Sequence, residues 1–600
     1  MSLISTQEVA LLSIDKLARS NLLAIDFETS SVNPVSCKVF LMSLYNGELS
    51  FVFDLTKIDL RLFKNLLETK VLIAQNAAYE LVILTRYGIH PNIIHDTYLA
   101  ECILTQGTQE KRNLGVLAEK YLNITLDKQV AKTITSKNYT SQKVVEYSRN
   151  DVIVLPTILK KQFTLLKKGD LYKTYLFELQ YLKVIAETSY HGIRLDPKAW
   201  AELNTQLRIN RDQALQELND LILEIDPELA NNSLFGFELN WNSPSQVKEL
   251  FNRYVDSKIT SVGEKKLNAY KGHPLVQKFL KYVSLSKRVS SFGDTYLEAI
   301  DKTTQRIHPS YTQIVATGRV SCRRPNIQNI PKQDMFRKCF IADPSNTLVV
   351  GDYSSQESRI LADKSQSPEL ISFFTSGGQD LHSFVALKAF ANEIGDIPIE
   401  EVKGKYPKLR DKAKAANFAL TYGGDGRTVA RNLNLPEEEG LAVEKAFFEA
   451  FPSIKEYFTS TKETSIRKGF IVTDNVIYRK IFSNNFVKSF KPINSMTKEE
   501  RILYFKSKSE FERLAMNYPI QGTAASMTKL AGIYLRQANL ERNLFRIVLF
   551  VHDEILLECA KEHALEVQGI LKECMERAAN VFCRSVSIPV EPMITEYWTH

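Results

Sequence analysis

The sequence predicts a multidomain protein of the α/β and α+β fold classes. Its 600 residues exceed one hydrophobic core, and at about 150 residues per domain they allow roughly four domains. Over 1–165, short apolar runs alternate with helical stretches, and the pattern is almost wholly helical from 171 to about 305. From 306 onward, strands alternate with long helices, which is typical of an α+β arrangement. The apolar runs of the first region are LLAIDF, VFLMSLY, LSFVFDL and KVLIAQN.

The composition is that of an ordinary globular protein. Hydrophobic residues make up 44% and charged residues 24%, which excludes the disordered, collagen-like and coiled-coil classes. No apolar run approaches the ~18 residues of a membrane helix, and the N-terminus lacks a secretory signal. The 7 cysteines include no C-x-x-C pair, which argues against a disulfide framework and a structural zinc site. We expect a cytoplasmic protein without a targeting signal or a membrane partner, and the net charge of +8 says little about other partners.

Two acidic side chains close the first apolar strand. The segment LLAIDFETS contains Asp26-Phe27-Glu28, and residues i and i+2 of a strand share a face, so both carboxylates point the same way. Like charges this close repel each other unless a cation lies between them, and a divalent metal ion with oxygen ligands would supply one. Two solvated acids at a strand end are the alternative, because D-x-E triplets often occur by chance.

Further acids follow at helical spacing. In QNAAYELVIL, Asn76 and Glu80 follow the apolar strand KVLIA. In VVEYSRNDVIVL, Tyr147 and Asp151 lie at i and i+4, on one face of a helix. This ordered set resembles the proofreading 3′–5′ exonuclease domain of the DnaQ-like group, which is built on a ribonuclease-H-like sheet.

The resemblance implies a role for each of these residues. Four acids would hold two divalent metal ions, and Tyr147 would orient the attacking water. The third acid of the family motif is usually aspartate, so Glu80 is a departure whose extra methylene displaces the carboxylate. The resemblance therefore implies activity but does not fix its rate. The four acids are Asp26, Glu28, Glu80 and Asp151.

The second half of the chain contains two motifs that mix basic and amide side chains. Arginines suit phosphate groups, and amides suit the edges of bases. A polar basic loop is the simpler alternative for the first motif. In ATGRVSCRRPNIQNIP the candidates are Arg319, Asn326 and Gln328, and in ERLAMNYPIQGTAASMTKLA they are Arg513, Asn517 and Gln521 at i, i+4 and i+8.

Two other motifs place acids at the ends of apolar strands. LVVGDYSSQESRILA is a strand that delivers Asp352, followed by a helix that begins near Glu357. FRIVLFVHDEILLECA is two strands around the turn His552-Asp553-Glu554. Since Asp352 and Asp553 both close strands, a shared sheet would bring them together around two metal ions about 4 Å apart. A hairpin turn with acids at its tip is, however, common.

The remaining motif, LRDKAKAANFALTYGG, repeats at a four-residue spacing. Arg410, Lys414, Phe418 and Tyr422 form one slowly drifting stripe on a helix. Two cations at one end and two aromatic rings at the other suit a nucleotide, with its phosphates at one end and its base stacked at the other. An ordinary amphipathic helix is the alternative.

The five motifs together resemble those of family A DNA polymerases, the bacterial DNA polymerase I group. The order is T-G-R, D-Y-S-x-x-E, R-x-x-x-K-x-x-x-F-x-x-x-Y-G, Q-G-T and V-H-D-E, and the resemblance covers essentially the whole chain. It implies an exonuclease domain followed by a right-hand polymerase. The expected parts are the exonuclease domain over 1–170, the thumb over 171–305, the first part of the palm over 306–362, the fingers and a connecting segment over 363–504, and the second part of the palm over 505–600.

The resemblance also implies ligands and site residues. Asp352 and Asp553 would hold two Mg²⁺ (or Mn²⁺) ions, and Glu357 would be the steric gate that crowds a ribose 2′-hydroxyl. The substrates would be primer–template DNA and deoxynucleoside triphosphates. Catalytic roles would fall to Asp352, Asp553, Glu554, Lys414 and, in the exonuclease domain, Tyr147. Nucleotide contacts would come from Arg410, Lys414, Phe418, Tyr422, His382 of GQDLHSF and Glu357, and DNA contacts from Arg319, Asn326, Gln328, Arg513, Asn517, Gln521 and His552.

Some positions depart from the commonest family pattern. Ser383 follows His382 where many relatives carry arginine, and Arg323 and Arg324 make their turn more basic than usual. Ser355 and Gln356 also replace the usual residues before the expected gate. The basic segment 471–510 has no expected role. These departures concern fidelity and nucleotide affinity rather than the reaction itself.

The leading hypothesis is a proofreading, template-directed DNA polymerase of replication or repair. We expect a monomer of the phage replicative or large-fragment type, without a 5′-nuclease domain, and with a helicase, a primase and a single-strand-binding protein as candidate partners. One alternative is a 3′–5′ exonuclease whose C-terminal half binds DNA without polymerising, and another is a non-catalytic nucleic-acid-binding protein. The intact acids and the phosphate-binding stripe favour the polymerase.

Overall fold

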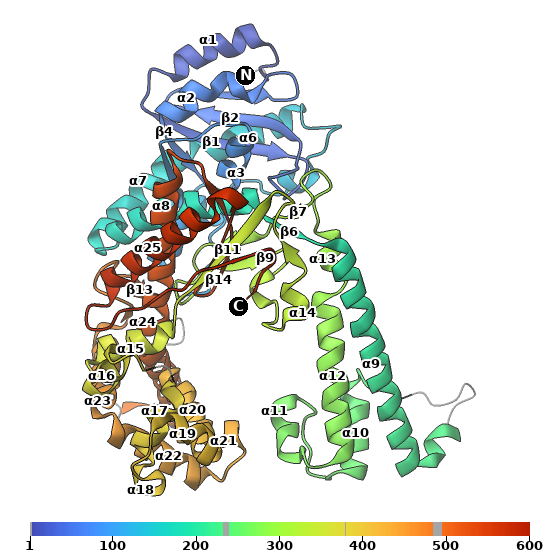
Figure 1. Ribbon diagram of the computed structural model, residues 1–600. Coiled ribbons are helices and arrows are strands. Elements are labelled where there is room, and N and C mark those ends of the chain that lie inside the picture. Colours follow the sequence, from blue (N-terminus) through green and yellow to red (C-terminus); the bar gives the residue numbers. More distant parts are fainter. Residues whose placement is uncertain (1–2, 232–238, 379, 484–494, 600) are drawn as a thin grey trace.

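The computed structural model describes residues 3–231, 239–378, 380–483 and 495–599. Figure 1 shows an N-terminal α/β domain, a central region of β-sheets next to it, and two helical arms that extend from the central region. Residues 484–494, within the basic segment without an expected role, lie outside the described residues.

The N-terminal domain is built on a five-stranded mixed sheet in the order β3-β2-β1-β4-β5. Strand β1 pairs antiparallel with β2 and parallel with β4. The four apolar runs singled out in the sequence form the first four strands, because their side chains supply the buried core of the domain. The strands are β1 (Leu22–Thr29), β2 (Val39–Tyr45), β3 (Ser50–Asp54), β4 (Val71–Ala74) and β5 (Ile93–Asp96).

Helices pack against this sheet, and one of them was not expected. Helix α1 (Gln7–Leu17) precedes β1, whereas the sequence pattern indicated a mainly β start. Ala10 and Leu17 are buried, but Leu11 and Leu12 are exposed, so apolar residues on the outer face obscure the helical period. The others are α2 (Lys64–Thr69), α3 (Ala78–Arg86), α4 (Thr97–Leu104), α5 (Leu114–Leu122), α6 (Gln142–Ile153) and α7 (Leu155–Lys168).

Helix α8 (Tyr172–His191) lies inside the molecule and not in an arm. It contacts α3 of the N-terminal domain, and also β14 (Phe545–Val551) and α24 (Lys498–Asn539) of the central region. Its buried side chains surround the helix, as a position between two packed regions requires. The segment 171–305, expected as the thumb, therefore begins with a helix of the central core.

One arm contains the long helices α9 and α12, which share a separate hydrophobic core with α10 and α11. Lys278 and Lys281 lie 3.3 and 3.0 Å from Glu217 Oε2 of the neighbouring helix. Part of the lysine-rich stretch is therefore paired with carboxylate rather than free. The helices of this arm are α9 (Pro197–Ile225), α10 (Pro244–Tyr254), α11 (Glu264–Leu267), α12 (Pro274–Phe292) and α13 (Thr295–Glu298).

The other arm is a cluster of mostly shorter helices. Helices α17 and α20 pack against each other, and α21 packs against α22. The helices are α16 (Pro368–Thr375), α17 (Leu381–Ala389), α18 (Ala391–Ile394), α19 (Ile399–Lys405), α20 (Pro407–Thr421), α21 (Gly426–Leu433), α22 (Glu437–Ala450) and α23 (Pro452–Lys468).

The central region is built on an antiparallel sheet in the order β14-β15-β11-β16. Strand β11 (Asn346–Asp352) pairs with β15 (Glu554–Ala560), so that Asp352 lies opposite Glu554. The expected domain boundaries 362/363 and 504/505 fall inside the continuous helices α15 (Gln356–Ser365) and α24.

The central region also contains helices and small sheets. The helices are α14 (Asp334–Arg337) and α25 (Ala564–Phe582), and β16 (Met593–Thr595) is the edge strand of the main sheet. The small sheets are formed by β6 (Ile193–Leu195), β7 (Arg306–Ile307) and β10 (Phe340–Ile341), by β8 (Ser310–Thr312) and β9 (Ser321–Arg323), and by β12 (Ile471–Val472) and β13 (Lys480–Ile481).

All seven cysteines are buried as free thiols. Among the described helices, none is both long and apolar enough to span a lipid bilayer.

Candidate functional site

Four acidic side chains of the N-terminal domain gather near the end of β1. Asp26 and Glu28 lie on β1, Glu80 lies in the first turn of α3, and Asp151 lies on α6. Burial and the charge of Asp151 raise the pKa of Asp26 to about 7. Burial and the charges of Asp26 and Asp151 raise the pKa of Glu28 to about 9. Carboxylates influence each other this way only when they are close, so the structure brings the four predicted acids together.

A lysine that the sequence pattern did not single out balances this cluster. Lys128 Nζ lies 2.5 Å from Asp151 Oδ2 and 5.0 Å from the centre of the Tyr147 ring. Against the effect of burial, its charge lowers the pKa values of Asp26, Glu28 and Asp151. No sequence signal marks it, because it lies in a loop without a fixed spacing from the acids.

The cluster offers the donor atoms of a divalent-metal site. Carboxylate oxygens are the ligands that Mg²⁺ prefers, and Glu80 Oε2 and Asp151 Oδ1 are buried without a hydrogen-bond partner among the described residues. Across the described ranges, no three His, Cys, Asp or Glu side chains are arranged to hold a metal ion as they stand. The acids therefore fit a metal ion by their chemistry, and joint coordination requires side-chain rearrangement.

Asp96, which was not an expected site residue, fixes the turn before Glu80. Its carboxylate accepts hydrogen bonds from the backbone N–H groups of Asn76 at 2.9 Å and Ala77 at 3.0 Å. It also caps α4 by accepting from Tyr98 N at 2.8 Å. Because Asn76 has a φ of +66°, in the left-handed region, these bonds hold a backbone conformation that would otherwise be unfavourable. Asp96 thereby sets where α3 begins and where Glu80 lies.

A second acidic pair lies in the central sheet. Asp352 ends β11, and Asp553 lies in the turn between β14 and β15. Burial and the charge of Asp352 raise the pKa of Asp553 to about 6. Burial also raises the pKa of Asp352, against the charge of Lys332 and a hydrogen bond with Asp553. The shared sheet predicted from the two strand ends is therefore present, and it places the two carboxyl groups together.

Glu554 has a different environment from its neighbour in sequence. It is buried, accepts a hydrogen bond from Trp598 Nε1 at 2.7 Å, and pairs with Arg337 Nη1 at 3.2 Å. Burial raises its pKa to about 7 against the charge of Arg337. Its expected position beside a primer end stays a prediction, and in the structure its carboxylate is held by Arg337 and Trp598 behind the aspartate pair.

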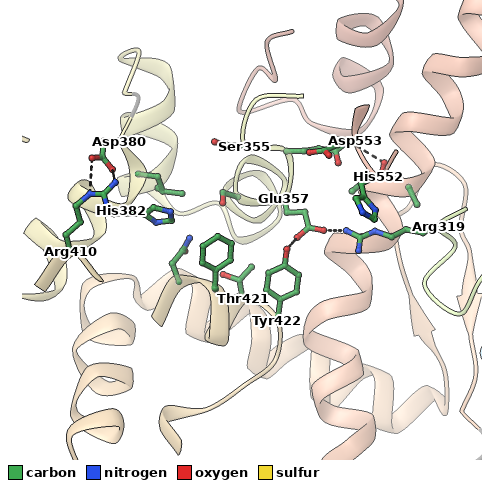
Figure 2. Close-up of a pocket in the computed structure, with 17 residues that line it drawn as sticks. Arg319, Ser355, Glu357, Asp380, His382, Arg410, Thr421, Tyr422, His552 and Asp553 are labelled. Carbon is green, nitrogen blue, oxygen red and sulfur yellow. Dashed lines mark hydrogen bonds and ion pairs between the residues drawn. The ribbon is translucent and has the colours of Figure 1, made fainter. Parts of the chain in front are cut away.

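A cavity of about 680 Å³ lies between Asp553 and the arm of shorter helices (Figure 2). One wall comes from the central region and includes Arg319, Glu357, His552 and Asp553. The opposite wall comes from α17 and α20. On that wall, Phe418 and Tyr422 are half-exposed and stack with their ring centres 6.5 Å apart. The cavity therefore combines carboxylates, cations and two accessible aromatic rings.

Three polar side chains meet between the two walls. The Glu357 carboxylate pairs with Arg319 and accepts a hydrogen bond from the Tyr422 hydroxyl (Figure 2). Burial and the charge of Glu357 raise the pKa of Tyr422. Glu357 is thus fixed from both sides, from the central region and from the helical arm.

The basic end of the predicted stripe is held by an acid that the sequence pattern did not single out. Arg410 donates from Nε and Nη2 to Asp380, both at 3.1 Å. Asp380 and Ser383 also hydrogen-bond each other at 2.8 Å. Although burial opposes it, these bonds lower the pKa of Asp380 to about 2. Burial lowers the pKa of His382, and the charges of Arg410 and Lys414 lower it further. These five residues therefore form one polar group.

The expected DNA-binding residues occupy several places. Gln328 is buried and donates to Phe550 O at 3.0 Å, and Asn326 O accepts from the Tyr296 hydroxyl at 2.8 Å. Arg513, Asn517 and Gln521 lie on α24. Arg513 lines a different cavity, of about 790 Å³, between α21, α22, α23 and α24.

Comparisons with known proteins agree with this architecture. Residues 209–600 match the model of DNA polymerase family A, and residues 1–166 match a 3′–5′ exonuclease model. DNA polymerase I of Aquifex aeolicus is 28% identical and covers 98% of this chain and 97% of the relative. DNA polymerase I of Borreliella burgdorferi is 29% identical, with 94% of this chain and 61% of the relative covered. The thermostable DNA polymerase I of Thermus aquaticus is 32% identical, with 64% and 45% covered.

A solved structure has the same fold. It is the POL domain of Pol1 from M. smegmatis in complex with a DNA primer-template and dNTP, with a TM-score of 0.82, 22% identity, and 100% of this chain and 99% of that chain covered. Polymerase and exonuclease domains of this family use divalent metal ions. The family model covers well over half of the chain and includes both carboxylates of the central sheet. The chain therefore belongs to DNA polymerase family A and is a DNA-directed DNA polymerase with a 3′–5′ exonuclease domain.

Proposed function

We propose that the chain extends the 3′ end of a DNA primer with deoxynucleoside triphosphates, copying a template, and that its N-terminal domain removes mismatched 3′ nucleotides. One observation carries the proposal. Asp553 of the aspartate pair lines a cavity whose opposite wall carries Arg410 and the aromatic rings of Phe418 and Tyr422.

Asp352 and Asp553 would hold two Mg²⁺ or Mn²⁺ ions. When bound, such ions would lower the pKa of the primer 3′-hydroxyl and neutralise the charge of the triphosphate. Lys332 and Arg337 already act on this pair, so the protein keeps two like-charged carboxyl groups together before substrate enters. Glu554 and His552 would flank the primer end from the same turn.

The α20 stripe would bind the incoming nucleotide. Arg410 is oriented by Asp380, and its Nη1 has no contact among the described residues, so it can donate to a phosphate. Lys414 and His382 lie next to it and would bind the other phosphate oxygens. Phe418 and Tyr422 would stack beside the sugar and the base.

Glu357 would select the sugar. Arg319 and Tyr422 hold its carboxylate at the edge of the cavity, where a fixed side chain excludes a ribose 2′-hydroxyl by occupying its space. Arg319 would also contact the minor groove of the primer end. Asn326, Gln328, Arg513, Asn517, Gln521 and His552 are proposed to contact the rest of the primer–template.

In the N-terminal domain, two divalent ions would be held by Asp26, Glu28, Glu80 and Asp151, and they would supply activation of water and stabilisation of the leaving oxygen. Tyr147 lies beside Asp151 on α6 and would orient that water. Lys128 would release Asp151 when a metal ion binds, because both compete for the same oxygens.

The expected division into thumb, palm and fingers is proposed with one change. We assign the thumb to α9–α13, and we assign α8 to the core between the exonuclease domain and the palm. The monomeric state, and helicase, primase and single-strand-binding protein as partners, stay predictions.

Incorporation of a labelled deoxynucleotide on a primed template tests the proposal. We expect Mg²⁺-dependent extension by the intact chain and none by the Asp553→Ala variant, while that variant still degrades single-stranded 3′ ends. Normal extension by Asp553→Ala would refute the site assignment. Degradation without any extension by the intact chain would instead favour an exonuclease with a non-polymerising C-terminal half.

A further inference from the structure

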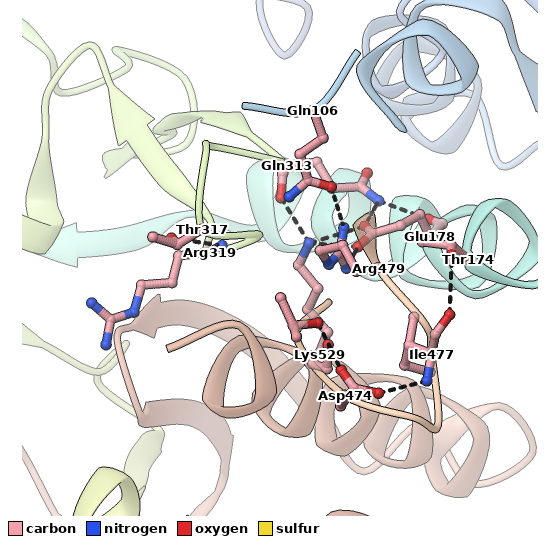
Figure 3. Close-up of polar contacts among 12 residues, drawn as sticks. Gln106, Thr174, Glu178, Gln313, Thr317, Arg319, Asp474, Ile477, Arg479 and Lys529 are labelled. Atoms are coloured by element: carbon pink, nitrogen blue, oxygen red, sulfur yellow. Dashed lines mark hydrogen bonds and ion pairs between the residues drawn. The ribbon is translucent and has the colours of Figure 1, made fainter. Parts of the chain in front are cut away.

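A group of charged and amide side chains is buried beneath the loop that carries Arg319 (Figure 3). We define this buried polar cluster as Gln106, Glu178, Gln313, Arg479 and Lys529. Gln106 belongs to the exonuclease domain, Glu178 to α8, and Lys529 to α24, while Arg479 lies between β12 and β13. Glu178, Arg479 and Lys529 are at most 1% exposed, so they form an enclosed ionic group, and the whole cluster joins five separate segments of the chain.

The cluster is closely bonded. Lys529 Nζ lies 2.8 Å from Glu178 Oε1, and Arg479 Nη2 donates to the same carboxylate. Arg479 Nη1 donates to Gln106 Oε1 at 3.2 Å, and Gln313 Nε2 donates to Glu178 Oε2 at 2.7 Å. Two cations share one carboxylate, so loss of Glu178 would leave two buried cations without a counter-charge. Each member therefore depends on the positions of the others.

The same side chains hold the backbone of the loop 313–318. Gln106 Nε2 donates to Ala316 O at 3.2 Å, and Lys529 Nζ donates to Gln313 O at 2.9 Å. Gly318 has a φ of +87°, and a Cβ there would lie 2.8 Å from Arg479 Nε. The Arg479 side chain thus packs directly against the one loop position that only glycine fits. An exonuclease-domain amide and a buried guanidinium together shape the backbone just before Arg319.

The Arg319 side chain points away from the buried polar cluster. Figure 3 shows its guanidinium directed away from the cluster, and in the nucleotide cavity it pairs with Glu357. Because Gly318 directly precedes Arg319, a shift of the loop moves the Arg319 side chain and with it the carboxylate that Arg319 holds. A contact in the exonuclease domain is therefore connected to the proposed sugar-selecting residue through three consecutive steps: Gln106 to Ala316, the loop to Arg319, and Arg319 to Glu357.

We infer that Gln106 and Arg479 are positioning residues for nucleotide selection at the polymerase site. In this role the exonuclease domain supports the loop of Arg319, and so influences the choice between deoxyribonucleotides and ribonucleotides without taking part in either reaction. The inference rests on the proposed function of Glu357. It also gives a role to Arg479, which belongs to the basic segment whose function the sequence left open.

A purely structural role for the cluster makes a different prediction. The cluster would then only join the domains, and its loss would lower stability without changing the nucleotide preference. Lys183 of α8 offers a matched control, because its Nζ donates to Pro91 O at 2.9 Å and to Asn92 O at 2.7 Å. That contact also joins α8 to the exonuclease domain, but it does not touch the loop 313–318.

The experiment compares the full-length Gln106→Leu, Arg479→Lys and Lys183→Met variants, each in an Asp26→Ala/Glu28→Ala background that leaves the products intact. Single-nucleotide incorporation with dCTP and CTP on one primer–template gives kcat and KM for each, and thermal unfolding gives the loss of stability. We expect Gln106→Leu and Arg479→Lys to raise the KM for dCTP and lower the dCTP/CTP preference, each on the order of tenfold, since a small misplacement has effects of this size. Lys183→Met should keep both values.

Two results would overturn the inference. One is a dCTP/CTP preference in Gln106→Leu equal to that of the parent, whatever the change in stability. The other is an equal loss of preference in Lys183→Met. If Gln106→Leu does not fold, Gln106→Glu takes its place: it keeps an acceptor for Arg479, adds a carboxylate next to the two cations of the cluster, and loses the donor to Ala316 O. Failure of the parent to incorporate dCTP at all would instead refute the proposed function.

Discussion

The exonuclease and polymerase sites each crowd acidic side chains together, but they balance the charge differently. In the exonuclease domain the ammonium group of Lys128 contacts Asp151 directly, and its charge also lowers the pKa values of Asp26 and Glu28. In the central sheet Asp553 of the aspartate pair opens onto a cavity, and the charges of Lys332 and Arg337 act on the pair from outside it. The first site therefore contains its own removable cation, whereas the second leaves space for a substrate and its metal ions.

The largest expected effect tests whether the two sites act independently. Asp26→Ala/Glu28→Ala should reduce trimming of a mismatched primer end by about 10³-fold or more, because metal-bound charge stabilisation is worth several kcal/mol. Extension of a matched primer should change by less than about twofold, since effects at distant sites are independent. Gel analysis of the products measures the rates of trimming and of extension. If the intact chain trims no faster than the variant, Glu80 or another change has disabled the domain.

The next prediction concerns the fixed carboxylate of the polymerase site. Glu357→Ala should weaken discrimination against ribonucleotides by about 10²-fold, because removing the side chain opens space for a hydroxyl group. Glu357→Gln keeps the size and loses the charge, so it should discriminate nearly as well as the parent. Competing dNTP and rNTP incorporation measures both. If Glu357→Ala prefers deoxyribonucleotides over ribonucleotides as strongly as the parent does, Glu357 is not the sugar-selecting residue.

A smaller effect tests the cation that distinguishes the two sites. Lys128→Met should tighten Mn²⁺ binding to the exonuclease acids by about tenfold, because a positive charge no longer competes for Asp151. Calorimetry in an Asp352→Ala/Asp553→Ala background would report this site alone. Lys143→Met, which removes an exposed lysine 3.9 Å from Asp127, is the control and should leave the affinity unchanged. Weaker binding in Lys128→Met would show that the lysine supports the site instead.

The smallest effect concerns a buried cation away from both sites. Burial lowers the pKa of Lys529 from 10.5 to about 8, against the charge of Glu178. Between these pH values the unfolded chain binds more protons than the folded one. The contribution of Lys529 to the free energy of unfolding therefore increases as the pH rises, by up to about 1.4 kcal/mol per pH unit. Lys529→Met lacks this term, and the intact chain should gain stability relative to it from pH 8 to 9.5. Urea unfolding at several pH values measures the free energy of unfolding of both proteins. A difference between them that stays constant with pH would contradict the lowered pKa of Lys529.

The sequence predicts the elements that repeat at short range. Strands β1, β11, β14 and β15 follow from apolar runs, and the stripe on α20 follows from a four-residue spacing, because neighbours in these elements are close in the chain. The same patterns predicted both acid groups. They could not predict Lys128 beside Asp151, Asp380 beside Arg410, or Arg479 beside Glu178, because those pairs form only when the tertiary structure brings separate segments together. The enclosed position of α8 was missed for the same reason.

The seven buried cysteines have a practical consequence. Burial raises the pKa of Cys339, Cys559 and Cys574 to about 11, and all seven thiols are shielded from solvent, so reagents that need an accessible thiolate react with them slowly. A pair of cysteines engineered on the outer faces of α12 and α21 would be labelled first by maleimide dyes. Energy transfer between the two dyes would then report the separation of the two arms during each nucleotide addition, without removal of any native cysteine.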